Sequence, residues 1–74
     1  PDPRMAEKVR QTIESDGDRV TDLHLWRLGP GHLGAIVAVA TEKHRGAEYY
    51  RRNLSKFGDL SHLTIEVSNQ AAAG

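Results

Sequence analysis

The stretch Leu33-Gly-Ala-Ile-Val-Ala-Val-Ala-Thr41 is a short, nearly continuous apolar run. Amphipathic helices and half-exposed strands place polar residues between their apolar ones at a regular spacing, and this run does not. It is typical of a strand that is covered on both faces, which in a small domain is the central strand of a sheet. We therefore predict a central strand over residues 32–41 and place the rest of the chain around it.

Two flanking segments alternate between apolar and polar residues, as strands with one exposed face do. The first covers residues 19–28 and is joined to the central strand by a turn at Gly29-Pro30-Gly31, so the two form a hairpin. The second covers residues 60–68. Alternation assigns the even-numbered side chains to one side of the sheet and the odd-numbered ones to the other: Val20, Asp22, His24, Trp26, His62, Thr64, Glu66 and Ser68 against Thr21, Leu23, Leu25, Arg27, Leu63, Ile65 and Val67.

Two amphipathic helices complete the chain. Residues 3–16 repeat apolar side chains at helical spacing, and Gly17 suits the left-handed conformation that often ends a helix. Residues 46–57 show the same spacing, through Ala47, Tyr50, Leu54 and Phe57. Residues 69–74 are a tail rich in small residues, which we expect to be flexible.

The predicted element order is α-β-β-α-β, in a single α+β domain that spans residues 1–74. The β-α-β half makes strands two and three parallel, and the hairpin makes strand one antiparallel to strand two. Both helices then cover one face of this three-stranded mixed sheet. The opposite face carries a tryptophan beside histidines and a carboxylate, and an exposed face of this kind usually contacts a partner.

The length, net charge and cysteine content of the chain exclude several classes of function. A chain of 74 residues buries only about 60% of its unfolded surface, so extra support from a metal or a partner chain is expected. Ten basic and ten acidic residues give no net charge, which argues against nucleic-acid binding. The absence of cysteine excludes disulfides, thiolate zinc sites and iron–sulfur clusters.

Histidine is the residue type that most suggests chemistry, because imidazole is the commonest metal-binding side chain. The sequence has His24, His32, His44 and His62. We expect a turn role for His32 and solvent exposure for His44. His62 and Glu66 are ~13 Å apart along one strand, so a site that uses both needs a neighbouring strand or another subunit. No serine has the context of a nucleophile and no Gly-rich phosphate loop leads into a helix, so we do not expect an enzyme.

Several segments resemble a known family. Val20-Thr-Asp-Leu-His-Leu-Trp-Arg-Leu-Gly-Pro-Gly-His32 is similar to the first strand of the cytoplasmic C-terminal domain of cation diffusion facilitator transporters. Leu60-Ser-His-Leu-Thr-Ile-Glu-Val67 is similar to its last strand, and Ala47–Leu54 resembles its second helix. The first strand looks most like the branch associated with cobalt and nickel export.

The resemblance implies a ferredoxin-like, metallochaperone-like sandwich. It implies a homodimer on the cytoplasmic side of the cell membrane, below a transmembrane domain of the transporter that this chain lacks. It also implies that a divalent transition metal (zinc, cobalt, nickel or cadmium) binds at or near the dimer interface and regulates cation export.

Carried over position by position, the resemblance implies a set of metal ligands and a set of interface residues. The ligands are His24 first, then Glu66 and His62, and then Glu48. The dimer interface is expected to contain Trp26, His24, His62 and Thr64.

The sequence departs from the family pattern at two ligand positions. The second strand has only apolar residues around Ala38 and Ala40, and Ser68 stands where some members have an aspartate. Two alternatives therefore stay open. One is a purely structural dimerisation domain of the same transporter without a physiological metal. The other is a free-standing module that senses a small ligand.

Overall fold

The computed structural model describes residues 3–70. Its elements are helix α1 (Pro3–Glu14), strands β1 (Arg19–Gly29) and β2 (His32–Thr41), helix α2 (Ala47–Asn53) and strand β3 (Leu60–Asn69). The strands form one sheet in the order β1-β2-β3, with β1 antiparallel and β3 parallel to β2. The prediction of a small α+β domain with a ferredoxin-like α-β-β-α-β arrangement is confirmed.

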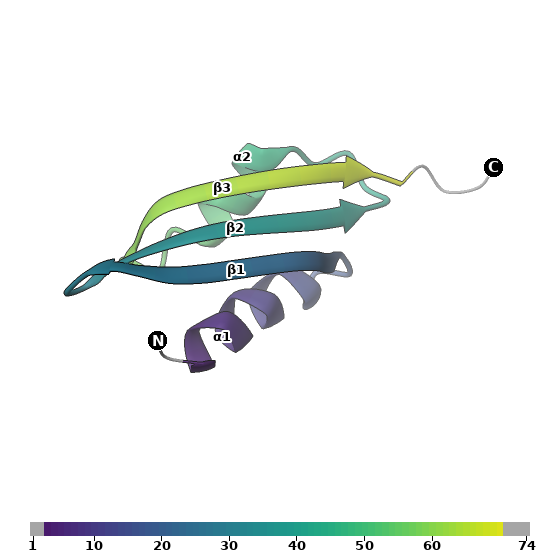
Figure 1. The fold of residues 1–74 in the computed structure, drawn as a ribbon. Coiled ribbons are helices and arrows are strands. Elements are labelled where there is room, and N and C mark those ends of the chain that lie inside the picture. Colours follow the sequence, from purple (N-terminus) through teal and green to yellow (C-terminus); the bar gives the residue numbers. More distant parts are fainter. Residues whose placement is uncertain (1–2, 71–74) are drawn as a thin grey trace.

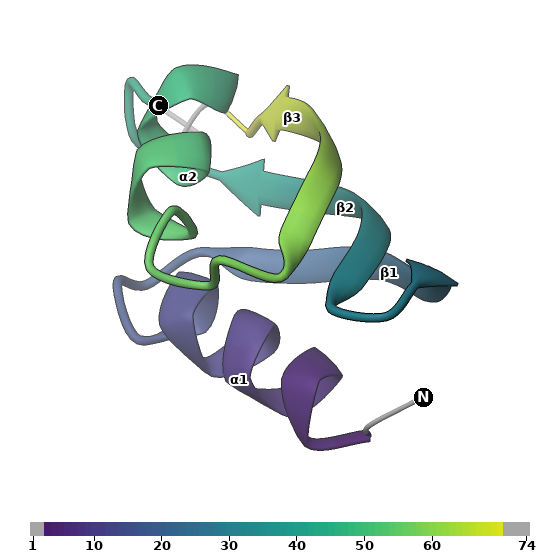
Figure 2. The same cartoon turned by 90° about the vertical axis from the view of Figure 1, so that its left-hand side faces the viewer.

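The two helices cover one face of the sheet. In Figure 1 the sheet lies in front of both helices, with its uncovered face toward the viewer. In Figure 2, which is turned by 90°, α1 lies beneath β1 and α2 lies beside β2 and β3. Neither helix within residues 3–70 is long and apolar enough to span a bilayer.

The hydrophobic core fills the space between the helices and the sheet. Val9 and Ile13 of α1 are 0% and 1% exposed, as their helical spacing predicts. Tyr50 and Leu54 anchor α2 in the same cluster, which is completed by Val20, Ala35, Val37, Val39 and Ile65. The odd-numbered side chains Leu23, Leu25, Leu63 and Val67 pack against this core, as alternation predicts.

Strand β1 departs from simple alternation at Thr21. Val20 pairs with Val39 and Asp22 pairs with Ala38, so Thr21 is an extra residue in β1. Such a bulge reverses the side to which the residues before it point. The assignment of Val20 to the exposed side is therefore wrong, because Val20 is 8% exposed and belongs to the core.

Strand β2 is the central strand, but the prediction that both of its faces are covered is wrong. Val37 and Val39 are buried against the helices, whereas Ile36 on the other face is 36% exposed. Its neighbours on that face, Gly34 and Ala38, have little side chain to expose. Small residues thus gave the sequence the apolar appearance of a strand buried on both sides.

Helix α2 is shorter than the predicted range of 46–57. It ends at Asn53 because the backbone hydrogen bonds after this residue join residues three apart, as in a 3₁₀ turn, instead of four apart. The Ser55 amide donates to the Arg52 carbonyl, and the Phe57 amide donates to the Leu54 carbonyl. Phe57 still packs against the core, although it lies outside the helix.

Strand β3 is longer than predicted. Asn69 is its last residue, and the Asn69 side-chain amide donates to the Lys43 carbonyl at 3.0 Å. The Gln70 amide donates to the Thr41 carbonyl at 2.7 Å. Asn69 and Gln70 are therefore held in place rather than part of a flexible tail, and residues 71–74 lie outside the described part of the chain.

A turn after α1 buries a carboxylate. The helix ends at Glu14, two residues before the predicted end, and Gly17 has a φ of +95°, which is the expected left-handed conformation. The turn places Asp18 against α2, with a side chain that is only 1% exposed. The Tyr50 hydroxyl donates to Asp18 Oδ2 at 2.6 Å, and Arg45 Nη1 donates to the same oxygen at 2.9 Å.

The partners of Asp18 keep it charged. Burial alone raises the pKa of this carboxyl group, but hydrogen bonds from Thr41, Tyr50 and Arg45 outweigh burial and leave the pKa of Asp18 below its usual value. The Arg45 guanidinium also lies over the Tyr49 ring, 4.3 Å from its centroid. The ionised carboxylate therefore joins the α1–β1 turn to α2 and to the loop before it.

We expect Asp18→Asn to lower the free energy of unfolding by about 1–3 kcal/mol at neutral pH, because it weakens charge-assisted hydrogen bonds. The folded-state pKa of Asp18 lies below the ordinary value of 3.8. The contribution of the Asp18 carboxylate to the free energy of unfolding is therefore complete at a pH above the ordinary pKa. It is lost as the pH falls through the folded-state pKa.

Urea unfolding of both proteins from about pH 7 to about pH 2 measures this difference. The gap in stability between wild type and Asp18→Asn should close at low pH. Asp59→Asn, which changes an exposed carboxylate, is the control. A gap of constant size across the pH range would contradict the assignment.

Candidate functional site on the open face of the sheet

We define the open face as the side chains that point away from the helices in three rows across the sheet. Each row takes one residue from β1, β2 and β3 in turn. The rows are Trp26–Gly34–His62, His24–Ile36–Thr64 and Asp22–Ala38–Glu66. The five residues predicted for this face, His24, Trp26, His62, Thr64 and Glu66, are all on it and all exposed.

Trp26 lies across Gly34 of the central strand. A Cβ atom added at Gly34 would be 2.5 Å from Cε2 and 2.6 Å from Cζ2 of the indole. Only glycine therefore allows this close approach of the ring to the backbone. Trp26 remains 40% exposed and Ile36 36% exposed, so the two form an apolar strip on the open face.

Asp22 and His24 contact each other on β1. Asp22 Oδ2 and His24 Nε2 are 3.2 Å apart, and the two side chains are 62% and 65% exposed. Two ligands bound to tetrahedral zinc at 2.0–2.1 Å are about 3.3 Å from each other. The two atoms are hydrogen-bonded, and their separation is also close to that of two neighbouring zinc ligands. From the sequence we predict His24 and not Asp22 as a metal ligand, although alternation puts both on one side of the strand, where they can pair.

The other predicted ligands do not join this pair within one chain. His62 and Glu66 lie on β3, which is separated from β1 by β2 and therefore by about 10 Å. Glu48 lies on α2, on the covered side of the sheet, with its carboxylate 3.5 Å from Nε of Arg51. Among residues 3–70, no three His, Asp or Glu side chains converge on one point.

The remaining histidines lie outside the three rows. His32 Nδ1 is 2.7 Å from the Ser61 hydroxyl oxygen, so it links the hairpin to the start of β3. His32 is the first residue of β2 rather than part of the turn for which it was predicted. His44 is exposed in the loop between β2 and α2, as predicted.

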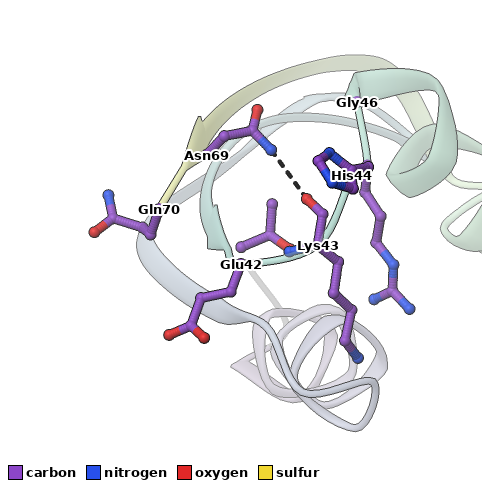
Figure 3. Close-up of a pocket in the computed structure, with 8 residues that line it drawn as sticks. Glu42, Lys43, His44, Gly46, Asn69 and Gln70 are labelled. Atoms are coloured by element: carbon purple, nitrogen blue, oxygen red, sulfur yellow. Dashed lines mark hydrogen bonds between the residues drawn. The ribbon is translucent and has the colours of Figure 1, made fainter. Parts of the chain in front are cut away.

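A cavity of about 370 Å³ lies beside that loop, lined by residues 41–46, Asn69 and Gln70. Figure 3 shows the Asn69 amide turned toward the Lys43 carbonyl rather than into the cavity. The Lys43 ammonium group donates to the Asp16 carbonyl at 2.7 Å. These polar groups are hydrogen-bonded to the chain itself and hold the loop in place.

No model of a known protein family matches the sequence, and no curated protein matches it either. The resemblance to cation diffusion facilitators therefore stays a prediction. The chemistry of the open face is the remaining basis for a functional proposal.

We expect Gly34→Ala to displace the Trp26 indole, because a Cβ atom 2.5 Å from a ring carbon of another residue would overlap it. Since Trp26 is the single tryptophan, its emission maximum should shift to longer wavelength and its near-ultraviolet dichroism should weaken. The strain should lower the free energy of unfolding by about 1–3 kcal/mol.

The matched control is Gly58→Ala, whose added Cβ has no heavy atom within 4 Å. Its tryptophan spectra should equal those of the wild type. Unchanged spectra in Gly34→Ala would show that the indole does not rest on Gly34.

Proposed function

We propose that this chain is the cytoplasmic regulatory and dimerisation domain of a divalent-cation efflux transporter of the cation diffusion facilitator type. Two copies associate through their open faces, and a transition metal bound between them controls export by the transmembrane part of the transporter. The observation that carries the proposal is the Asp22–His24 pair, which has the spacing of metal ligands on the face of the sheet opposite to α1 and α2.

Each chain supplies half of a metal site in this proposal. Zinc prefers four nitrogen, oxygen or sulfur ligands. One chain offers the His24 nitrogen and an Asp22 oxygen, and a second copy related by two-fold symmetry offers the same two. Imidazole and carboxylate ligands suit zinc, cobalt and nickel, so zinc is the first ion to test.

The open face is small for an interface. All three strands share eight rows, from Leu33 to Ala40 of β2. These rows span about 26 Å by about 14 Å, or ~360 Å² per copy, whereas a typical stable interface buries about 800 Å² per partner. An additional link between the copies is therefore expected, and a shared metal ion supplies one.

The charges of the open face also favour a cation. Asp22 and Glu66 are the acidic residues of the three rows, so two packed copies bring four carboxylates together, and Arg19, which pairs with Ala40 in the next row, is the nearby cation. Like charges oppose association unless they are neutralised. An ion that binds only the dimer stabilises it by mass action, so metal concentration controls association.

The remaining predicted ligands have other roles in this proposal. Glu66 and His62 lie on the far strand from His24 and contribute to the interface. Glu48 has no part in the site, because α2 holds it on the covered side of the sheet.

A purely structural dimerisation domain is the second candidate. It is favoured by the lack of three converging His, Asp or Glu side chains in the described residues 3–70. The apolar strip of Trp26 and Ile36 would then hold the dimer without metal, and Asp22–His24 would be an exposed hydrogen-bonded pair of little energetic weight.

We expect Zn²⁺ to bind the metal-free chain saturably, at about one ion per two chains, and to convert monomer into dimer. His24→Ala should abolish both effects, and Asp22→Asn should weaken binding about tenfold or more. Calorimetry measures the stoichiometry, sedimentation velocity measures the dimer, and Trp26 fluorescence follows the interface.

His44→Ala is the matched control, because it removes an exposed imidazole that lies far from the open face. It should bind zinc as the wild type does. Cobalt, nickel and cadmium are titrated in the same way. A dimer that forms equally in EDTA, with no saturable zinc uptake, would select the structural candidate.

A further inference from the structure

The register of the open face restricts how two copies can pack, an inference that rests on the dimerisation proposed above. Face-to-face sheets lie about 10 Å apart with their strands nearly aligned. Two identical copies pack about a two-fold axis, so the same residues face each other reciprocally. An axis through the central Ile36 runs either across the strands or along β2, and the two choices oppose different residues.

An axis across the strands brings β1 to the partner's β1 and β3 to the partner's β3. Equivalent strands of the two copies then run in opposite directions, so the row of Gly34 in one copy faces the row of Ala38 in the other, and the row of Ile36 faces itself. His62 of each copy meets the partner's Glu66, so an imidazole donor faces a carboxylate twice. Asp22 faces the partner's Trp26, whose indole N–H is a donor.

The same axis brings the two His24 side chains together. His24 is in the row of Ile36, which the axis crosses, so it faces the partner's His24. Each imidazole brings its Asp22 at 3.2 Å. The four ligands of the proposed metal site therefore gather on the β1 side of the interface.

An axis along β2 gives a poorer match. It places β1 over the partner's β3 and keeps each row over itself. Asp22 then faces the partner's Glu66, and this contact between like charges occurs twice. The two His24 side chains lie at opposite edges of the interface, so they cannot bind one ion.

We propose that the open face binds a second copy of the chain about a two-fold axis that crosses the strands at Ile36. Reciprocal His62–Glu66 contacts form on the β3 side, and the Asp22–His24 ligands meet on the β1 side. Hydrogen bonds and metal thus act on opposite edges of one interface, with the apolar contact of the two Ile36 side chains between them.

Glu66→Gln distinguishes the two axes by the sign of its effect. It removes an exposed charge without adding a metal ligand. With the axis across the strands, two charge-assisted contacts weaken, so the dimer dissociation constant rises about fivefold or more. With the axis along β2, the repulsion between Asp22 and Glu66 disappears, so the dissociation constant falls.

Sedimentation equilibrium of the 74-residue chain, in saturating zinc and again in EDTA, measures these constants. Glu7→Gln removes an exposed charge from α1 and controls for net charge. Far-ultraviolet dichroism and thermal melting verify that each variant is folded.

The double exchange His62→Glu with Glu66→His should restore the wild-type constant, because each new carboxylate again meets an imidazole. A stronger dimer in Glu66→Gln, no change in it, or no rescue by the exchange would overturn the proposed axis. A zinc-dependent wild-type dimer would still support the proposed function in that case. Absence of any wild-type dimer would overturn both.

Discussion

The buried carboxylate of Asp18 is the contact on which the remaining arrangement depends. Helices of 12 and 7 residues are too short to be stable by themselves in water. Asp18 follows α1 and accepts hydrogen bonds from Tyr50 of α2 and from Arg45 in the loop before it. The end of one helix is thereby fixed to the other, and the core residues Val9, Ile13, Tyr50 and Leu54 hold both helices against one face of the sheet. Neither helix of residues 3–70 covers the opposite face, which leaves its polar residues available to a partner.

Two local features of the sheet decide what the uncovered face presents. The bulge at Thr21 turns Val20 into the core while Asp22, two residues later, points outward. Without the extra residue, side chains would alternate strictly along β1, and Val20 would share one face with Asp22 and His24. Either Val20 would be exposed, or Asp22 and His24 would be buried. Gly34 adds the second feature, because only its bare backbone lets the Trp26 indole lie against the central strand. Apolar surface and potential metal ligands are therefore neighbours on one strand.

Periodicity predicted most of the fold because exposure follows directly from the spacing of apolar residues. Alternation alone placed His24 and Glu66 on the uncovered side. It failed at Val20, since a bulge depends on the pairing with β2 and not on the pattern within one strand. It also missed Asp18, whose contacts with Arg45 and Tyr50 join residues 27 and 32 positions apart. In the candidate site, residue type identified His24 and alternation placed Asp22 on the same side of β1, but the 3.2 Å contact between them is seen only in the structure.

The small size of the open face has a consequence for how the proposed dimer would act. A large apolar interface associates permanently and leaves nothing for an ion to control. Here Gly34 and Ala38 limit the apolar contact, and Asp22 and Glu66 oppose association until they are neutralised or paired. Association then depends on the ion, and linkage requires that the dimer bind the ion more tightly than the monomer does. An interface that is marginal by itself is therefore the kind that lets ion concentration set the oligomeric state.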